Sequence, residues 1–186
     1  MQLFLPKKHY TYNKPYMVGM ERKAYRLNDG REIHIEPLQA TDKDRLTQFY
    51  RSMSANDLRW SKAPKDYQID EKFRYPDYYI SLITVYDDKV VGYGEIHKDP
   101  QKRDGELTIH IHPNYQGVGL GTSMMIMLVK EATEQKLHSI YLQVAMVNTS
   151  AVHLFRKFGF QEQHTTQALY WGEEHDTLHM SKVLNR

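Results

Sequence analysis

Apolar and polar residues follow two different spacings along the chain, and each change of spacing marks a new element. Alternating or β-branched runs predict strands at residues 23–27, 32–37, 78–86, 90–96, 106–112, 139–147, 160–169 and 176–184. Apolar residues three or four apart, behind capping residues, predict helices at residues 41–53, from residue 54 onward, at 122–136 and at 150–158. The order β-β-α-α-β-β-β-α-β-α-β-β indicates an α/β (α+β) fold, a mixed sheet with helices on both faces.

Turn residues predict how several of these elements are connected. The segments Asn28-Asp29-Gly30 and Asp87-Asp88-Lys89 each separate two β-rich runs, which is typical of a hairpin. Gly159 follows the last helical run at the position where a left-handed residue ends a helix. Residues 1–30 are expected to be an N-terminal extension and the first hairpin strand, packed on a domain formed by residues 31–186.

Composition is that of a soluble globular domain. The chain has 186 residues, of which 40% are hydrophobic and 26% charged, with a net charge of +2. This balance indicates no nucleic-acid partner, and the longest apolar run, residues 124–129, is too short to cross a membrane. The sequence contains no cysteine, which excludes disulfides and thiolate metal sites, and its first residues lack the apolar stretch of a signal peptide. We therefore expect a cytoplasmic protein with no membrane partner.

A glycine-rich turn between a predicted strand and a predicted helix is the strongest chemical signal. Three glycines occur within five positions, Gly117, Gly119 and Gly121, so backbone amides and a helix N-terminus converge where a phosphate could bind. A dinucleotide fingerprint would need glycine at Thr122, and a P-loop would need a lysine well before Lys130. A nucleotide-like ligand and a purely structural turn both remain open from this segment alone.

The pattern Q-x-x-G-x-G, formed by Gln116, Gly119 and Gly121, resembles the acyl-CoA pyrophosphate loop of the GNAT superfamily of N-acyltransferases. Residues 148–160 are similar to the family's N-x-x-A-x-x-L-[YF]-x-K-x-G-F segment. Residues 90–94 resemble its third strand, and residues 35–42 resemble its opening strand and helix. The resemblance runs from about residue 31 to 183, and four motifs in order are more specific than one. A looser likeness, at residues 45–54, Arg59 and Glu106, is to the GNAT domain of bacterial protein-lysine acetyltransferases.

The resemblance implies a GNAT fold, with a mixed, mostly antiparallel sheet of about seven strands and helices on both faces. It implies acetyl-CoA as cosubstrate and transfer of the acetyl group to a primary amine by direct attack. The acceptor could be a small molecule or a protein lysine, and a homodimer is possible. The alternative is an acyl-CoA-binding regulatory domain with weak or no turnover.

The resemblance also assigns roles to individual residues. Glu106, ten residues before Gln116, corresponds to the catalytic base, and the N–H of Ile111 would stabilise the tetrahedral intermediate. The residues expected to contact the cofactor are Ile109, His110, Ile111, Gln116, Gly117, Val118, Gly119, Leu120, Gly121, Thr122, Asn148 and Phe155.

Two positions depart from the family pattern. Phe155 stands where many members have a tyrosine that protonates the leaving thiolate, and Gln143 stands where some have a glutamate base. A thiol pKa of about 8.5 makes the thiolate an adequate leaving group without that acid, so Phe155 does not exclude catalysis. Both departures place the catalytic burden on Glu106, with His110 or His112 as a reserve base.

Structural explanations compete with each of these functional ones. Glu106 could simply be a solvated residue at a strand end, and Asn148 could be a helix cap, alone or in addition to binding the cofactor. No third ligand accompanies the paired histidines of residues 110–112, so we predict no metal site. Trp60 and Tyr67 lie in the segment where family members shape the acceptor site, and contact with the acceptor is a hypothesis.

Overall fold

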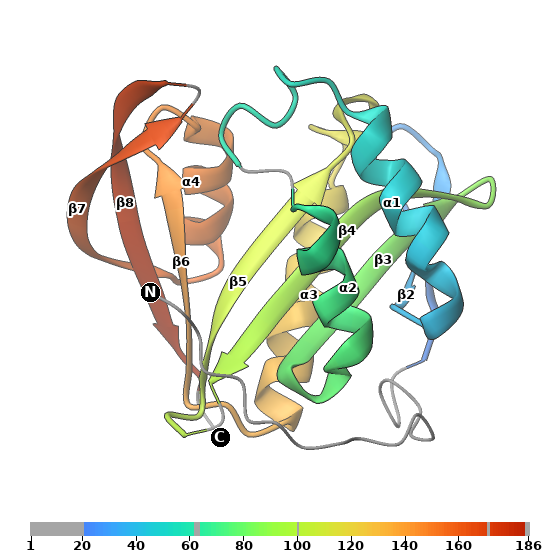
Figure 1. Ribbon diagram of the computed structural model, residues 1–186, viewed down its shortest axis with the longest axis horizontal. Coiled ribbons are helices and arrows are strands. Elements are labelled where there is room, and N and C mark those ends of the chain that lie inside the picture. Colours follow the sequence, from blue (N-terminus) through green and yellow to red (C-terminus); the bar gives the residue numbers. More distant parts are fainter. Residues whose placement is uncertain (1–20, 62–63, 100, 171, 185–186) are drawn as a thin grey trace.

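One sheet of eight strands organises the computed structural model, which describes residues 21–61, 64–99, 101–170 and 172–184 (Figure 1). The strand order is β1-β2-β3-β4-β5-β6-β8-β7, and of the seven adjacent pairs only β5 and β6 are parallel. The strands are β1 (Lys23–Arg26), β2 (Glu32–Pro37), β3 (Tyr79–Tyr86), β4 (Lys89–Asp99), β5 (Asp104–Ile111), β6 (Ser139–Ala145), β7 (Gln161–Tyr170) and β8 (Glu173–Val183). The expected mixed, mostly antiparallel sheet is confirmed, with one strand more than the seven estimated.

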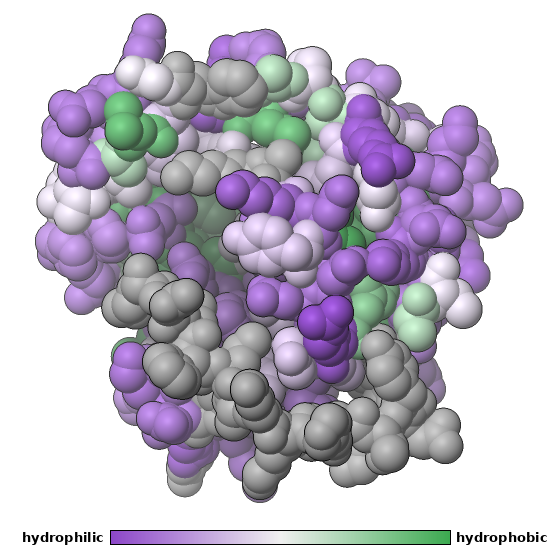
Figure 2. Space-filling model, viewed as in Figure 1, coloured by the Kyte–Doolittle hydropathy of each residue, from purple (hydrophilic) through white to green (hydrophobic). Residues whose placement is uncertain are grey.

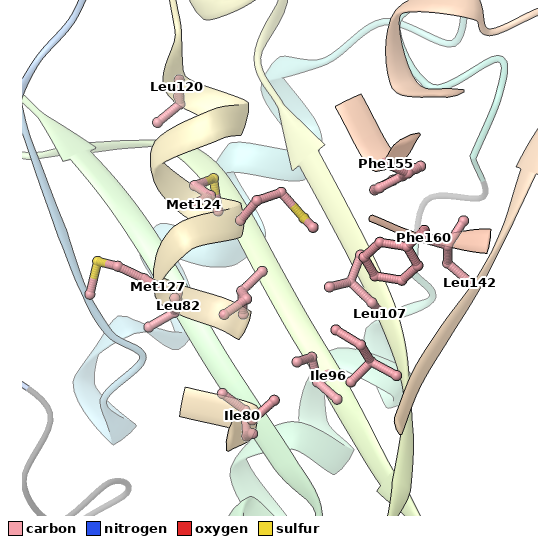
Figure 3. Packing of buried hydrophobic residues seen from close by; sticks show 14 of the residues in the cluster. Ile80, Leu82, Ile96, Leu107, Leu120, Met124, Met127, Leu142, Phe155 and Phe160 are labelled. Carbon is pink, nitrogen blue, oxygen red and sulfur yellow. The ribbon is translucent and has the colours of Figure 1, made fainter. Parts of the chain in front are cut away.

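Four α-helices cover the two faces of this sheet: α1 (Lys43–Ser52), α2 (Asp66–Arg74), α3 (Leu120–Glu134) and α4 (Thr149–Lys157). Helices α1 and α2 lie in front of β2, β3 and β4 in Figure 1, and α3 lies behind. Side chains alternate between the faces, so Leu82 joins the cluster under α3 and Ile83 the cluster under α1 and α2. Figure 3 shows the first cluster, with Leu120, Met124 and Met127 on α3 and with Phe160 beside Leu107 and Leu142.

The second helix does not begin where the sequence predicted it. Ser54 and Asp57 form the expected reciprocal bonds, Ser54 N to Asp57 Oδ2 at 2.7 Å and Asp57 N to Ser54 Oγ at 3.3 Å. Turns follow them at residues 55–60, and the helix is α2, from Asp66 to Arg74. Ile69 and Phe73, four residues apart, are buried in the cluster with α1, so tertiary burial selects the later segment. The prediction of a helix starting at residue 54 was therefore wrong.

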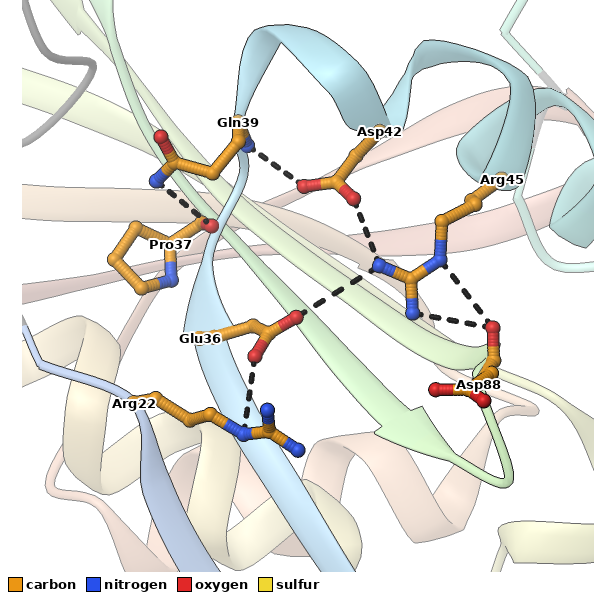
Figure 4. Close-up of polar contacts among 7 residues, drawn as sticks. All are labelled: Arg22, Glu36, Pro37, Gln39, Asp42, Arg45 and Asp88. Carbon is orange, nitrogen blue, oxygen red and sulfur yellow. Dashed lines mark hydrogen bonds and ion pairs between the residues drawn. The ribbon is translucent and has the colours of Figure 1, made fainter.

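Charged residues fasten the start of α1 to the sheet (Figure 4). The Arg45 guanidinium contacts Asp42 Oδ1 at 2.8 Å and Glu36 Oε1 at 3.8 Å. It also donates to the carbonyl of Asp88 in the β3–β4 turn, and Arg22 pairs with Glu36 at 3.3 Å. Arg45 thus joins α1 to β2 and to the β3–β4 hairpin.

The beginning of the chain is described only in part. Residues 1–20 of the expected extension lie outside the described residues, while β1 pairs with β2 in the predicted hairpin. The proposed boundary between residues 30 and 31 therefore stays a prediction. No helix in the described ranges combines the length and apolar character needed to cross a membrane.

Candidate active site

The parallel strands β5 and β6 pair only at their beginnings. The paired positions are Asp104 with Ser139, Gly105 with Ile140 and Glu106 with Tyr141, and the strands then diverge (Figure 1). In the same view, Figure 2 shows apolar atoms at the bottom of a recess in this region. Among the described residues, the second half of β5 therefore has β4 on one edge and no strand on the other.

Backbone groups of β5 point into this opening between the strands. The N–H of His112 donates to Val91 O of β4 at 3.0 Å, and hydrogen-bonding direction alternates along a strand. The N–H groups of Ile109 and Ile111 therefore point away from β4, toward the side that β6 has left. An extended ligand can pair with such an edge as an added strand does.

The glycine-rich turn lies at the end of β5 and leads directly into α3. Gly117 and Gly119 have positive φ angles of 71° and 95°, which side chains with a Cβ rarely adopt. Helix α3 begins at Leu120, two residues earlier than predicted, so Gly121 and Thr122 belong to its first turn. The N–H groups of that turn have no acceptor within the helix and carry the positive end of its dipole.

Contacts around the turn hold it against its neighbours. Gln116 Nε2 donates to Ile111 O at 2.9 Å, and Asn28 N donates to Val118 O at 3.0 Å. A Cβ added at Gly121 would lie 3.1 Å from Leu154, whereas one at Gly117 would meet nothing within 4 Å. Gly121 therefore serves helix packing, while the space beside Gly117 is open. Free amides, positive potential and open space together fit a pyrophosphate group.

Helix α4 supplies the two remaining residues of the expected cofactor site. Asn148 is its N-cap, and its Oδ1 accepts from Ala151 N at 3.4 Å, so the capping role holds whether or not the residue also contacts a cofactor. Phe155 is buried, and its ring lies 5.8 Å from that of Phe160. Phe155 is thus part of the core next to the opening and offers no proton donor.

Glu106 lies at the last paired position before β5 and β6 separate. It is half-buried, and within the described residues it makes no ion pair or side-chain hydrogen bond. Burial, and secondarily the charge of Glu95, raise the pKa of the Glu106 carboxyl above its ordinary value. A carboxyl with a raised pKa is a stronger base once ionised, which is what proton abstraction from an amine requires.

Glu95 belongs to a buried network that was not predicted from the sequence. Its carboxylate pairs with Lys72 Nζ of α2 at 2.5 Å and accepts from the Tyr93 hydroxyl at 2.6 Å. Lys72 is only 6% exposed, and its ammonium lies 5.0 Å from the centre of the Tyr79 ring. Strand alternation in V-V-G-Y-G-E places Glu95 on the buried face of Tyr93, and this is the signal that could have found it.

His110 lies on the same face of the sheet as Glu95 and Glu106, where it contacts α1. Its Nδ1 is 2.9 Å from the Tyr50 hydroxyl, while its Nε2 is buried without a hydrogen-bond partner. Burial lowers the pKa of His110 to about 4, so the ring is neutral near pH 7. His112, the other reserve base, accepts at Nδ1 from Asn114 N at 3.3 Å. Both histidines thus have structural contacts, and His110 is a poor base.

The two aromatic residues proposed for the acceptor site lie on different elements. The Trp60 ring contacts the β7–β8 hairpin. Its centre lies 6.0 Å from the centre of the Tyr170 ring and 5.1 Å from that of the His175 ring. Tyr67 is on α2, not in a loop, and is 58% exposed. The described part of the chain contains no group of three or more side chains suited to hold a metal ion.

Comparison with known proteins shows the family of this chain. Residues 43–160 match the acetyltransferase (GNAT) family. A spermidine N(1)-acetyltransferase of Vibrio cholerae is 36% identical over 45% of this chain, and the matched segment covers 53% of that relative. A probable spermine N(1)-acetyltransferase of Bacillus subtilis subsp. natto is 30% identical over 65% of this chain and 84% of the relative.

A solved structure extends the comparison to the fold. Spermidine N-acetyltransferase from Vibrio cholerae, in complex with CoA and spermine, superposes with a TM-score of 0.68 at 21% identity, over 82% of this chain and 95% of that one. The chain belongs to the acetyltransferase (GNAT) family. This membership confirms the class expected from the sequence, an N-acetyltransferase with acetyl-CoA as cosubstrate.

Proposed function

We propose that this protein acetylates a primary amine by direct attack on acetyl-CoA, with Glu106 as the general base. The observation that carries the proposal is the position of Glu106, which is half-buried where β5 and β6 separate and makes no ion pair or side-chain hydrogen bond with any other described residue. The same opening exposes the backbone of β5 on one side and ends at the glycine turn. Glu106, the open edge of β5 and the glycine turn therefore follow one another along a single strand and its continuation.

Each step of the reaction has a group of this chain to support it. An alkylammonium with a pKa of about 10.4 must lose a proton, and Glu106 accepts it directly or through a water. The amine nitrogen then bonds to the thioester carbon, whose oxyanion the Ile111 N–H stabilises. The C–S bond breaks, and the second proton of the amine nitrogen passes through water to the leaving thiolate, without help from Phe155. Residues 116–122 hold the pyrophosphate, and Ile109 and Ile111 pair with the pantetheine arm.

The proposed reaction is compatible with more than one class of amine acceptor. Two relatives carry names that specify spermidine or spermine, which favours a small alkylamine among the acceptors to test. A protein lysine presents the same alkylammonium and is the other acceptor that we propose to test. The homodimer, the absence of nucleic-acid and membrane partners, and the cytoplasmic location remain predictions.

The decisive experiment replaces the proposed base. Glu106→Gln should lower kcat by about 100-fold or more while acetyl-CoA affinity stays nearly unchanged, because the amide keeps the shape but cannot accept the proton. Rates would be measured by thiol release, and acetyl-CoA affinity by calorimetry. Glu134→Gln, on the exposed end of α3, is the matched control. Unchanged turnover in Glu106→Gln would exclude this mechanism.

The second candidate is a regulatory domain that binds acyl-CoA with little turnover. The observation that favours it is Phe155, buried against Phe160 where a proton donor would help catalysis. Calorimetry with CoA, together with a broad amine screen, separates the two candidates. Tight CoA binding with no acetylated product from any amine would support the regulatory domain.

A further inference from the structure

Glu106 lies in a continuous row of side chains that crosses the sheet. The register pairs Tyr79 of β3 with His97 of β4, His97 with Glu106 of β5, and Glu106 with Tyr141 of β6. Residues paired across neighbouring strands present their side chains on the same face, about 4.8 Å apart from strand to strand. Glu106 is therefore flanked by an aromatic ring on each side.

The two flanking rings differ in what they contact. His97 stacks on Tyr79 with ring centres 4.6 Å apart, and burial lowers its pKa, so it is an uncharged part of the packed side of the row. Tyr141 is 38% exposed although it lies in the middle of a sheet. Burial of its hydroxyl, and then the Glu106 charge, raise the pKa of Tyr141 and keep the phenol neutral. An exposed neutral ring beside a carboxylate that pairs with no other described side chain is suited to a cation.

The protein already binds one alkylammonium in this way on the same face. The Lys72 ammonium pairs with Glu95 at 2.5 Å while lying 5.0 Å from the Tyr79 ring centre and 5.7 Å from that of Tyr93. Both distances are within the roughly 6 Å range of cation–π attraction. Glu106 and Tyr141 repeat the combination of carboxylate and tyrosine ring, and no lysine of the described ranges pairs with them.

We propose that Tyr141 is a specificity-determining residue of the acceptor site, whose ring holds the ammonium and first methylene groups of a primary alkylamine beside Glu106. The inference rests on the proposed function and names its acceptor as an alkylammonium ion, the chemistry of a linear amine or a lysine side chain. Tyr141 binds the amine through its ring face, and its hydroxyl takes no part in proton transfer.

The test compares removal of the ring with removal of the hydroxyl alone. Tyr141→Leu should raise the KM for a linear alkylamine about 3- to 30-fold, the range expected for a cation–π contact between an exposed and a desolvated site. Tyr141→Phe should stay within about twofold of the wild type, because it keeps the ring face. The KM for acetyl-CoA should not change in either variant. Leu169→Ala, at a 59% exposed position on β7, is the surface control.

Three results would overturn the inference. They are an unchanged amine KM in Tyr141→Leu, an equal loss in Tyr141→Phe, and a parallel rise in the KM for acetyl-CoA. Binding of the amine to the CoA complex, measured by calorimetry on the wild type and Tyr141→Leu, gives the same comparison without turnover. Glu106→Gln assayed alongside separates the two proposals, since full turnover in that variant rejects the base while the Tyr141 comparison still stands.

Discussion

Glu95 and Glu106 lie on the same face of the sheet, on adjacent strands, in opposite surroundings. Glu95 lies under α2, paired with Lys72 and bonded by Tyr93. Glu106 lies beyond α2, where β6 diverges, and has neither kind of partner within the described residues. A compensated buried carboxylate contributes to the structure, while an uncompensated one at an opening keeps its capacity to take a proton. Both residues are glutamates on one face of the sheet, so the helices and strands around each one decide whether its carboxylate is paired.

The largest expected effect tests the compensated site. Lys72→Met should lower the free energy of unfolding by about 3–5 kcal/mol, because it leaves the Glu95 charge buried without its partner. The double variant Lys72→Met/Glu95→Gln should recover most of this loss, since no unpaired charge remains. Denaturant unfolding measures both variants. Equal stability of Lys72→Met and the wild type would remove the contrast with Glu106.

A smaller loss of stability should follow from the second partner of Glu95. Tyr93→Phe keeps the fully buried ring but removes the hydroxyl that donates to the carboxylate at 2.6 Å. A hydrogen bond to a charged group contributes about 1.5–3 kcal/mol, and the free energy of unfolding should fall by that amount. Glu106→Gln, measured in parallel, should not be destabilised, because its carboxylate has no such bond to lose. A larger loss in Glu106→Gln than in Tyr93→Phe would reverse the comparison.

The smallest expected effect links the two sites through pH. Because the pKa of Glu106 is raised, kcat/KM should rise with pH through an acidic limb placed above the usual glutamate range, as the base becomes ionised. The charge of Glu95 contributes to the raised pKa of Glu106. The double variant Lys72→Met/Glu95→Gln should therefore move the acidic limb of kcat/KM to lower pH. The measurement is kcat/KM for the amine from acidic to neutral pH. An acidic limb that stays in place, or moves to higher pH, would contradict the prediction that the Glu95 charge raises the pKa of Glu106.

Local patterns predicted most of the elements. Both hairpins, the β5 strand, the glycine turn and the order of the elements agree with the sequence, because turn residues and side-chain periodicity act over a few residues. The start of α2 did not follow from local signals. Ser54 and Asp57 make their capping bonds, but the burial of Ile69 and Phe73 against α1 decides where the helix forms.

The candidate site divides in the same way. The sequence by itself determined the glycine turn and the strand that precedes it, since these lie within one short segment, and the family resemblance of that segment points to Glu106 as the candidate base. Only the tertiary structure brought Lys72 to Glu95 and Tyr141 to Glu106, because these pairs depend on helix placement and strand register across 23 and 35 positions of the chain. Register is set by which faces are buried, and that is a property of the whole sheet.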